Sequence, residues 1–181
     1  MTASVQFTSE RLVLRSIGES DEELYCALFS NAETMRYIGP PWTRAQAALA
    51  FRDVLRTTRR RPPRARFLTL TPKDTPLSIG LCTLQNFDRP RRQAELGMMF
   101  VPSGRAQGFA TETLIAVIAH AFATLQFDEV WVRIAAGHAA AERTAVRGGL
   151  VRHAEAPPHN PAANLQRWSA YRASWGTPDR T

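Results

Sequence analysis

The chain has 181 residues and a mass of 20.2 kDa, a length that suits one domain with a substantial core. Apolar residues make up 44% of it and charged residues 22%, which excludes a disordered chain and, with no run of about 20 apolar residues, a membrane-spanning one. The net charge of +7 is compatible with a polyanionic partner without requiring one. We therefore expect a single domain over residues 1–181.

The first half of the chain combines strand patterns with two helix patterns. Two segments have apolar residues at helical spacing: residues 20–29 and 40–58. Ser20 and Glu23 form the pattern of a capping box for the first of these helices, and Thr43 is placed to cap the second. Four segments alternate or are continuously apolar and predict strands: residues 10–17, 65–71, 77–85 and 93–101.

The second half alternates strands and helices. Residues 110–125 carry one apolar stripe at intervals of three and four and predict the strongest helix of the chain. The other expected elements are a strand at 129–135, a short helix at 139–149, a loop at 155–164 and a strand at 165–175. This order predicts one mixed α/β layer structure.

Six arginines crowd the segment 56–66, and only one of the 23 basic residues of the chain, Lys73, is a lysine. The simplest interpretation of this segment is a solvated helix end and loop, and binding of a polyanion, a ribosome or an acidic substrate is the alternative. The six are Arg56, Arg59, Arg60, Arg61, Arg64 and Arg66.

The N-terminal residues "MTASVQFTSERL" lack the basic and apolar regions of a secretory signal, so we expect a cytoplasmic location. Cys26 and Cys82 lie far apart in the sequence, and no histidine pair has metal-ligand spacing. Both cysteines are expected to be reduced and packed, and we expect no metal site.

The segment "SGRAQGFATET" at residues 103–113 joins a predicted strand to the strongest helix. A glycine-containing loop at a helix start exposes several backbone N–H groups at the positive end of the helix dipole, where phosphates bind. The loop fits neither G-x-G-x-x-G nor G-x-x-x-x-G-K-[ST], which argues against dinucleotides and nucleoside triphosphates. Residues 105–110 do match R/Q-x-x-G-x-G/A.

Together with "ELGMMFVPS" before it and "TETLIAVIAHAF" after it, this motif resembles the acetyl-CoA site of the GCN5-related N-acetyltransferase (GNAT) superfamily. The opening "TSERLVLRSIGESDEELYCALFSNAETMRYIG" is similar to the branch that includes the ribosomal-protein N-terminal acetyltransferases. The resemblance extends to about Leu150. It implies a single-domain acyl-CoA N-acyltransferase fold with a central mixed, mostly antiparallel sheet, flanked by helices and splayed at the cofactor strand.

The resemblance also implies acetyl-CoA as cosubstrate, with its pantetheine arm paired to strand backbone and its pyrophosphate on the loop amides. At the family's usual asparagine and serine positions this chain has His138 and Ala141, so His138 is expected to take over a cofactor contact. The predicted cofactor-binding residues are Phe100, Val101, Arg105, Ala106, Gln107, Gly108, Phe109, Ala110, Thr111 and His138.

The implied reaction is direct attack of a primary amine on the thioester, which needs alignment, proton removal and an oxyanion donor. The backbone N–H near Phe100 is the expected donor. Glu95 could relay the proton through water, or it could be a strand carboxylate paired with an arginine. Ser103 could protonate the leaving thiolate or cap the helix.

The acceptor is expected to be a protein N-terminal amine or a small-molecule amine, with Tyr37, Trp42 and Trp168 as candidate wall residues. One alternative is a degenerate, non-catalytic module of this fold that binds an acyl-CoA or RNA, the latter through residues 56–66. Another is transfer of a longer acyl group into a pocket around Met98 and Met99. A homodimer is compatible with the sequence.

Overall fold

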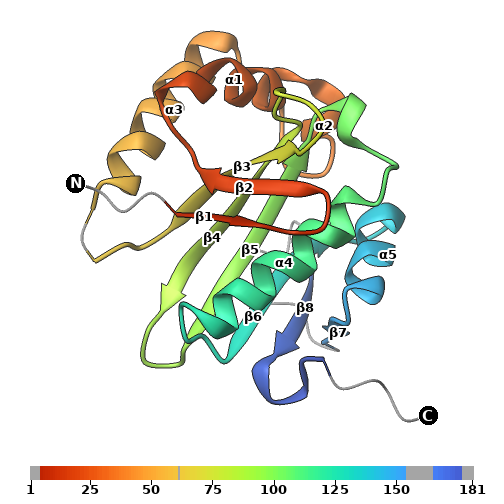
Figure 1. The fold of residues 1–181 in the computed structure, drawn as a ribbon. Coiled ribbons are helices and arrows are strands. Elements are labelled where there is room, and N and C mark those ends of the chain that lie inside the picture. Colours follow the sequence, from red (N-terminus) through yellow and green to blue (C-terminus); the bar gives the residue numbers. More distant parts are fainter. Residues whose placement is uncertain (1–4, 61, 154–164, 177–181) are drawn as a thin grey trace.

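A computed structural model describes residues 5–60, 62–153 and 165–176 of the chain. Its centre is an eight-stranded sheet in the order β1-β2-β3-β4-β5-β6-β8-β7 (Figure 1). Every neighbouring pair is antiparallel except β5 and β6, which are parallel. The strands are β1 Gln6–Thr8, β2 Leu12–Ser16, β3 Arg66–Pro72, β4 Gly80–Asp88, β5 Gln93–Phe100, β6 Glu129–Ala135, β7 Val151–Arg152 and β8 Leu165–Tyr171.

Helices cover both faces of the sheet, as predicted (Figure 1). The α-helices are α1 Glu22–Ser30, α2 Ala32–Met35, α3 Arg44–Thr58, α4 Phe109–Ala123 and α5 Ala139–Arg147, and the 3₁₀ turns are η1 Glu19–Asp21, η2 Pro102–Gly104 and η3 Arg172–Ser174. The apolar stripe of α4 packs into the main core with α5 and one sheet face, whereas α1 and α3 form a second cluster on the opposite face. Leu96 of β5 belongs to the first cluster and Met99 to the second, because even- and odd-numbered residues of this strand point to opposite faces of the sheet.

Of the two helix caps predicted in the N-terminal half, one is confirmed and the other is wrong. The Thr43 cap is confirmed, since its hydroxyl accepts from the Gln46 N–H at 3.2 Å. The Ser20 capping box is wrong. Asp21 instead accepts from the Gly18 N–H at 2.7 Å, and it also pairs with Arg15 at 2.7 Å. Since η1 takes up this first turn, α1 begins only at residue 22.

Three short elements escaped prediction, namely β1, α2 and β7, each four residues or fewer. The last predicted strand ends at Tyr171 and continues as η3. The predicted loop at 155–164 lies outside the described residues. Cys26 and Cys82 are confirmed as buried free thiols, and burial raises the pKa of Cys82 to about 12.

The sheet splits between its two parallel strands. Pairing of β5 with β6 covers only Gln93–Glu129, Ala94–Val130 and Glu95–Trp131. Beyond that point β5 stays paired with β4 as far as Phe100, while β6 stays paired with β8 as far as Ala135. The two halves of the sheet therefore diverge, and residues 96–100 are not paired with residues 132–135; this unpaired interval, here called the cleft, is the splay that the family resemblance implies.

Candidate acetyl-CoA site

The loop before α4 is an open cradle of backbone donors. Among the described residues, none of the N–H groups from Ala106 to Thr111 has a hydrogen-bond partner. The N-cap of α4 is Gly108, which has no side chain to cap these groups. Gly108 has a φ of +81° and Ala106 a φ of +60°, so the backbone turns twice through the left-handed region. These donors meet the positive end of the helix dipole, which is an anion-binding arrangement.

Arg11, from the turn between β1 and β2, lies against the cradle. Its Nη1 donates to the Gln107 carbonyl at 3.0 Å, and its guanidinium lies 4.6 Å from the centre of the Phe109 ring. A Cβ on Gly108 would lie 3.3 Å from Arg11 Nη2. Arg11 is not among the predicted site residues, because nothing local in the sequence connects position 11 with position 108. It brings a positive charge to the side of the exposed amides.

Glu112, in the first turn of α4, holds Arg11 in place. It accepts from the Arg11 backbone N–H at 2.6 Å, from Arg11 Nε at 2.8 Å and from the Ser9 hydroxyl at 2.6 Å. Burial alone would raise the pKa of Glu112, and these hydrogen bonds with the Arg11 charge outweigh it, so the pKa lies below its ordinary value.

We expect Glu112→Gln to lower the free energy of unfolding by roughly 1–3 kcal/mol at neutral pH, because a partly buried charged acceptor of three hydrogen bonds is lost. A lowered pKa stabilises the fold above the ordinary value of 4.5, and this contribution disappears as the pH falls through the folded-state pKa. The difference between wild type and variant should therefore be constant above about pH 5.5 and shrink in acid. Urea unfolding from pH 3 to 8 measures it, and a difference that grows in acid contradicts the clamp.

The β5 edge of the cleft presents free backbone groups at alternate residues. The Val101 N–H donates to the Ile79 carbonyl at 2.9 Å, so this residue faces β4. Backbone groups of successive residues point to opposite edges, and those of Met98 and Phe100 therefore face β6. The Phe100 carbonyl accepts from Arg105 Nε at 3.2 Å. The Phe100 N–H has no hydrogen-bond partner among the described residues.

Val101 corrects one prediction. It was expected to pair with the pantetheine arm, but its N–H is bonded to Ile79 and its carbonyl accepts from the Gly104 N–H at 2.9 Å. The residue just before β4 therefore takes its N–H, and the η2 turn that begins immediately after it takes its carbonyl. Phe100 and Met98 are the residues with backbone groups directed into the cleft.

The Arg105 side chain points away from the cradle. Its Nη1 lies 2.8 Å from a Glu33 carboxylate oxygen and its Nη2 donates to the Thr34 hydroxyl at 2.5 Å. Both partners belong to α2, so the arginine ties this helix to the loop. Its backbone N–H donates to the Pro102 carbonyl at 3.2 Å, so Arg105 adds no free backbone donor to the cradle.

Glu95, at the closed end of the cleft, is an ion-paired strand carboxylate. It is only 5% exposed, and it accepts from Arg133 Nε at 2.8 Å, from Arg133 Nη2 at 3.1 Å and from Asn86 Nδ2 at 2.5 Å. Of the two interpretations left open by the sequence, this is the pairing with an arginine. The proton-relay role stays a prediction.

Comparison with known proteins agrees with this geometry. Residues 11–151 match the family model described as "Acetyltransferase (GNAT) domain". The chain belongs to the GNAT family. It is 25% identical over 143 residues to the uncharacterized N-acetyltransferase YoaA of Bacillus subtilis strain 168, covering 78% of this chain and 80% of that protein.

Solved structures show the same fold. A spermidine N-acetyltransferase from Vibrio cholerae, determined with CoA and spermine, superposes with a TM-score of 0.76 at 17% identity, covering 90% of this chain and 96% of that one. A protein provisionally assigned as a ribosomal-protein-serine acetyltransferase, also from Vibrio cholerae, gives 0.75 at 20% identity, covering 94% and 99%. As a GNAT protein this chain is an acetyl-CoA-dependent N-acetyltransferase.

His138, at the family's usual asparagine position, is the N-cap of α5 and forms a ring stack with Tyr37. Its ring lies 3.9 Å from that of Tyr37, with an interplanar angle of 17°. Burial, together with the nearby Arg36 charge, lowers the pKa of His138 despite the opposing effect of Glu142. The imidazole is therefore neutral at pH 7. The ring that stacks on it, Tyr37, comes from a distant segment of the sequence.

The remaining predicted substrate and catalytic residues are Trp168, Trp42 and Ser103. Trp168 is 7% exposed and faces the main core, which contradicts its prediction as a wall residue, since its place in β8 puts it on the α4 face. Trp42 stacks on Phe29 at 4.6 Å within the second cluster. Ser103 is exposed in η2 and does not cap α4, because Gly108 is the N-cap; its role with the thiolate stays a prediction.

The Arg-rich segment is separate from the GNAT site. Figure 1 places the end of α3 across the sheet from the start of α4. Arg56 pairs with Asp53, and Arg59 lies 2.9 Å from Glu19, so both cations are partly neutralised. RNA binding by this segment stays a prediction.

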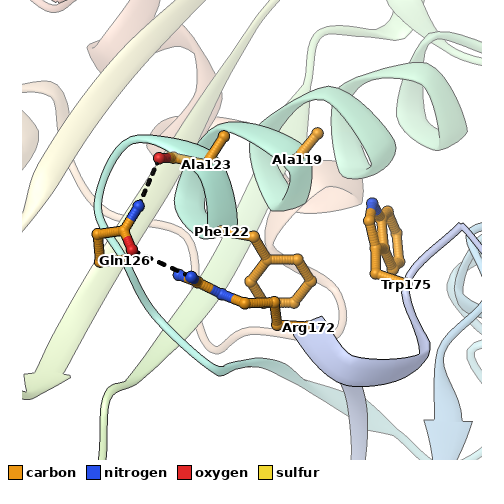
Figure 2. A pocket seen from close by; sticks show the side chains of 6 residues that line it. All are labelled: Ala119, Phe122, Ala123, Gln126, Arg172 and Trp175. Carbon is orange, nitrogen blue, oxygen red and sulfur yellow. Dashed lines mark hydrogen bonds between the residues drawn. The ribbon is translucent and has the colours of Figure 1, made fainter.

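A pocket of about 380 Å³ lies at the opposite end of α4 from the cradle (Figure 2). Its lining residues are Ala119, Phe122, Ala123, Gln126, Arg172 and Trp175. The 15-residue helix separates it from the cradle by roughly 20 Å, so it is not part of the acetyl-CoA site.

Within the described parts of the chain, no helix is long and apolar enough to cross a membrane, and no cluster of three acidic, histidine or cysteine residues could hold a metal ion.

Proposed function

We propose that this protein transfers the acetyl group of acetyl-CoA to a primary amine by direct attack of the amine on the thioester carbonyl. One observation carries the proposal: unpartnered amides from Ala106 to Thr111 adjoin a strand edge whose own backbone groups face an open cleft. A cosubstrate with a pyrophosphate at one end and an amide-containing arm needs these two surfaces side by side. Acetyl-CoA supplies the activated acyl group, and the chain supplies position and charge.

The phosphate end fits the residues present. The six N–H groups, which have no partner among the described residues, and the helix dipole favour two phosphates. The guanidinium of Arg11 lies beside them, with its charge partly neutralised by Glu112. Gly108 leaves room for close approach, because it lacks a Cβ at the point where Arg11 and the amides converge. Gln107 is held by its own side-chain bond to the Ser103 carbonyl at 2.6 Å, which fixes the loop before any ligand arrives.

At the reacting end, the Phe100 N–H is the proposed donor to the thioester oxygen. It is preorganised by the β4–β5 ladder and needs no rearrangement. Glu95 is proposed as a positioning residue, because Arg133 and Asn86 occupy its oxygens. The His138–Tyr37 stack is proposed to border the acceptor side, where a neutral imidazole neither repels an ammonium nor competes for phosphate.

Relatives with this fold act on different amines. The solved neighbours include a spermidine N-acetyltransferase and a protein provisionally assigned as a ribosomal-protein-serine acetyltransferase. Fold similarity alone therefore favours neither a small-molecule amine nor a protein N-terminus. We propose an amine acceptor of one of these two kinds.

Calorimetric titration with acetyl-CoA, followed by measurement of CoA thiol release with a panel of amines, tests the proposal. We expect micromolar binding and acetylation of at least one amine class, with the product confirmed by a mass increase of one acetyl group. Titration with acetyl-pantetheine, which lacks the pyrophosphate, is the control and should give much weaker binding. Equal binding of the two compounds contradicts the cradle, and no binding of acetyl-CoA contradicts the function.

A further inference from the structure

Two arginines lie side by side on the sheet face opposite α4, next to the closed end of the cleft. Arg133 of β6 and Arg167 of β8 are directly paired across the two strands. Their guanidinium carbons lie 5.6 Å and 4.5 Å from the centre of the Trp131 ring, so both stack on the same indole. Like charges in directly opposed positions repel, and such a pair needs compensating charge.

Compensation comes from beneath the pair. Arg133 is held by Glu95, and Arg167 Nη2 donates to Glu129 Oε1 at 2.7 Å. The two carboxylates are 5% and 6% exposed, whereas the arginine side chains are 41% and 27% exposed. The negative charges are thus buried and the positive ends face outward.

The outward edges of both guanidinium groups are free to bind. Arg133 uses Nε and Nη2 for Glu95, and Arg167 uses Nη2 for Glu129 and Nε for the Ser169 hydroxyl at 3.5 Å. Among the described residues, neither Nη1 has a hydrogen-bond partner. Two planar forks fixed on one aromatic ring match the geometry of a carboxylate or phosphate.

The position of the pair connects it with the acceptor. Pairing of β5 and β6 ends at Glu95–Trp131, and Arg133 is the next residue of β6 on the same face. The pair therefore lies where the cleft opens, on the face away from α4 and its cradle. Arg133 is thus two residues along β6 from the last residue that pairs with β5, the strand that carries the proposed oxyanion donor.

We propose that Arg133 and Arg167 bind an anionic group of the acceptor, so that the preferred acceptors are amines that also carry a carboxylate or a phosphate. This inference rests on the proposed acetyl transfer and names its substrate class. It disfavours polyamines, because Glu95 and Glu129 are already bonded to arginines. Beside the Tyr37–His138 stack, the charge of Arg36, 5.4 Å from the Tyr37 ring, is opposed by that of Glu142 and leaves no net negative charge between these two groups. A second ammonium group would meet positive charge.

A matched acceptor series tests the inference. Each ω-aminocarboxylate with two to five methylenes is compared with the diamine and with the n-alkylamine of equal length, and 2-aminoethyl phosphate provides the phosphate arm. We expect kcat/KM for the best aminocarboxylate or aminophosphate to exceed that of its diamine by about tenfold to a hundredfold, the range for a charge-assisted contact. The better of the two anions identifies the acceptor chemistry. Diamines that match or exceed them overturn the inference.

Variants connect the preference with the pair. Arg167→Gln should bring the ratio of anion-bearing to neutral amine within about threefold of unity, and Arg167→Lys should retain part of it. Arg52→Gln, an exposed position on α3, is the control and should leave the ratio unchanged. An unchanged ratio in folded Arg167→Gln also overturns the inference.

The two proposals fail separately. Absence of heat with acetyl-CoA contradicts acetyl transfer. Calorimetry of 4-aminobutyrate and butane-1,4-diamine against the protein, with and without CoA, measures the arginine pair without turnover. If the diamine binds more tightly than the aminocarboxylate in this calorimetry, the anion site is contradicted, whereas the proposed acetyl transfer is not.

Discussion

Replacing Gly108 with alanine should lower the affinity for acetyl-CoA by at least about tenfold, a loss of roughly 1.4 kcal/mol in binding. The new methyl group would lie 3.3 Å from Arg11 Nη2, at the point where the guanidinium and the loop amides converge. It would also force a side chain into a φ of +81°, which costs roughly 1–2 kcal/mol. Calorimetric titration with acetyl-CoA measures the first effect and urea unfolding the second.

Gly149→Ala separates the two effects. Gly149 ends α5 with a φ of +74°, and its Cβ would make only an ordinary contact with Trp175 at 3.9 Å. We expect this variant to lose similar stability and to bind acetyl-CoA as wild type does. Equal loss of affinity in both variants would assign the effect to backbone strain rather than to the cradle.

Sequence reasoning succeeded where a few neighbouring residues determine the structure. The strand–loop–helix order around residues 103–113 and the Thr43 cap depend on short-range hydrogen bonds and on the conformational freedom of glycine. The splay was predicted through the family resemblance, since no local pattern shows that two parallel strands stop pairing after three residues.

Contacts between side chains of distant segments could not be predicted from the sequence. Arg11 meets Gln107 across 96 positions, and Arg105 meets Thr34 across 71. An arginine near a phosphate motif is naturally assigned to the phosphate, but the partner of a long side chain depends on which element packs beside it. In this fold α2 takes Arg105, and Arg11 takes the place beside the amides.

The arginine pair depends on strand register in the same way. Arg133 and Arg167 are 34 positions apart, and only the antiparallel register of β6 with β8 puts them opposite each other. The parallel register of β5 then puts Glu95 opposite Trp131, from where it reaches Arg133 two residues further along the same face of β6. A shift of one residue would move the arginines into the core face, so the buried apolar face of these strands fixes the polar face as well.

Phe100→Pro should lower kcat about 100- to 1,000-fold relative to Phe100→Ala, because proline removes the backbone N–H proposed to bind the thioester oxygen. That N–H faces the cleft and takes no part in the β4–β5 ladder, so its loss leaves the sheet pairing intact. Proline fixes φ near −65° and is tolerated in strands where its missing N–H is not needed for the ladder.

The alanine variant is the matched control, since both substitutions remove the same buried ring from the main core, at a cost of roughly 3–5 kcal/mol in stability. Circular dichroism shows whether both remain folded at the assay temperature. Steady-state kinetics with saturating acetyl-CoA then compare the presence and absence of one N–H group. Equal kcat values in the two folded variants contradict the Phe100 donor and move the search to Met98, whose N–H is the other cleft-facing donor at this end of β5. A loss confined to the proline variant, with acetyl-CoA affinity retained, means that this N–H acts during transfer rather than in binding.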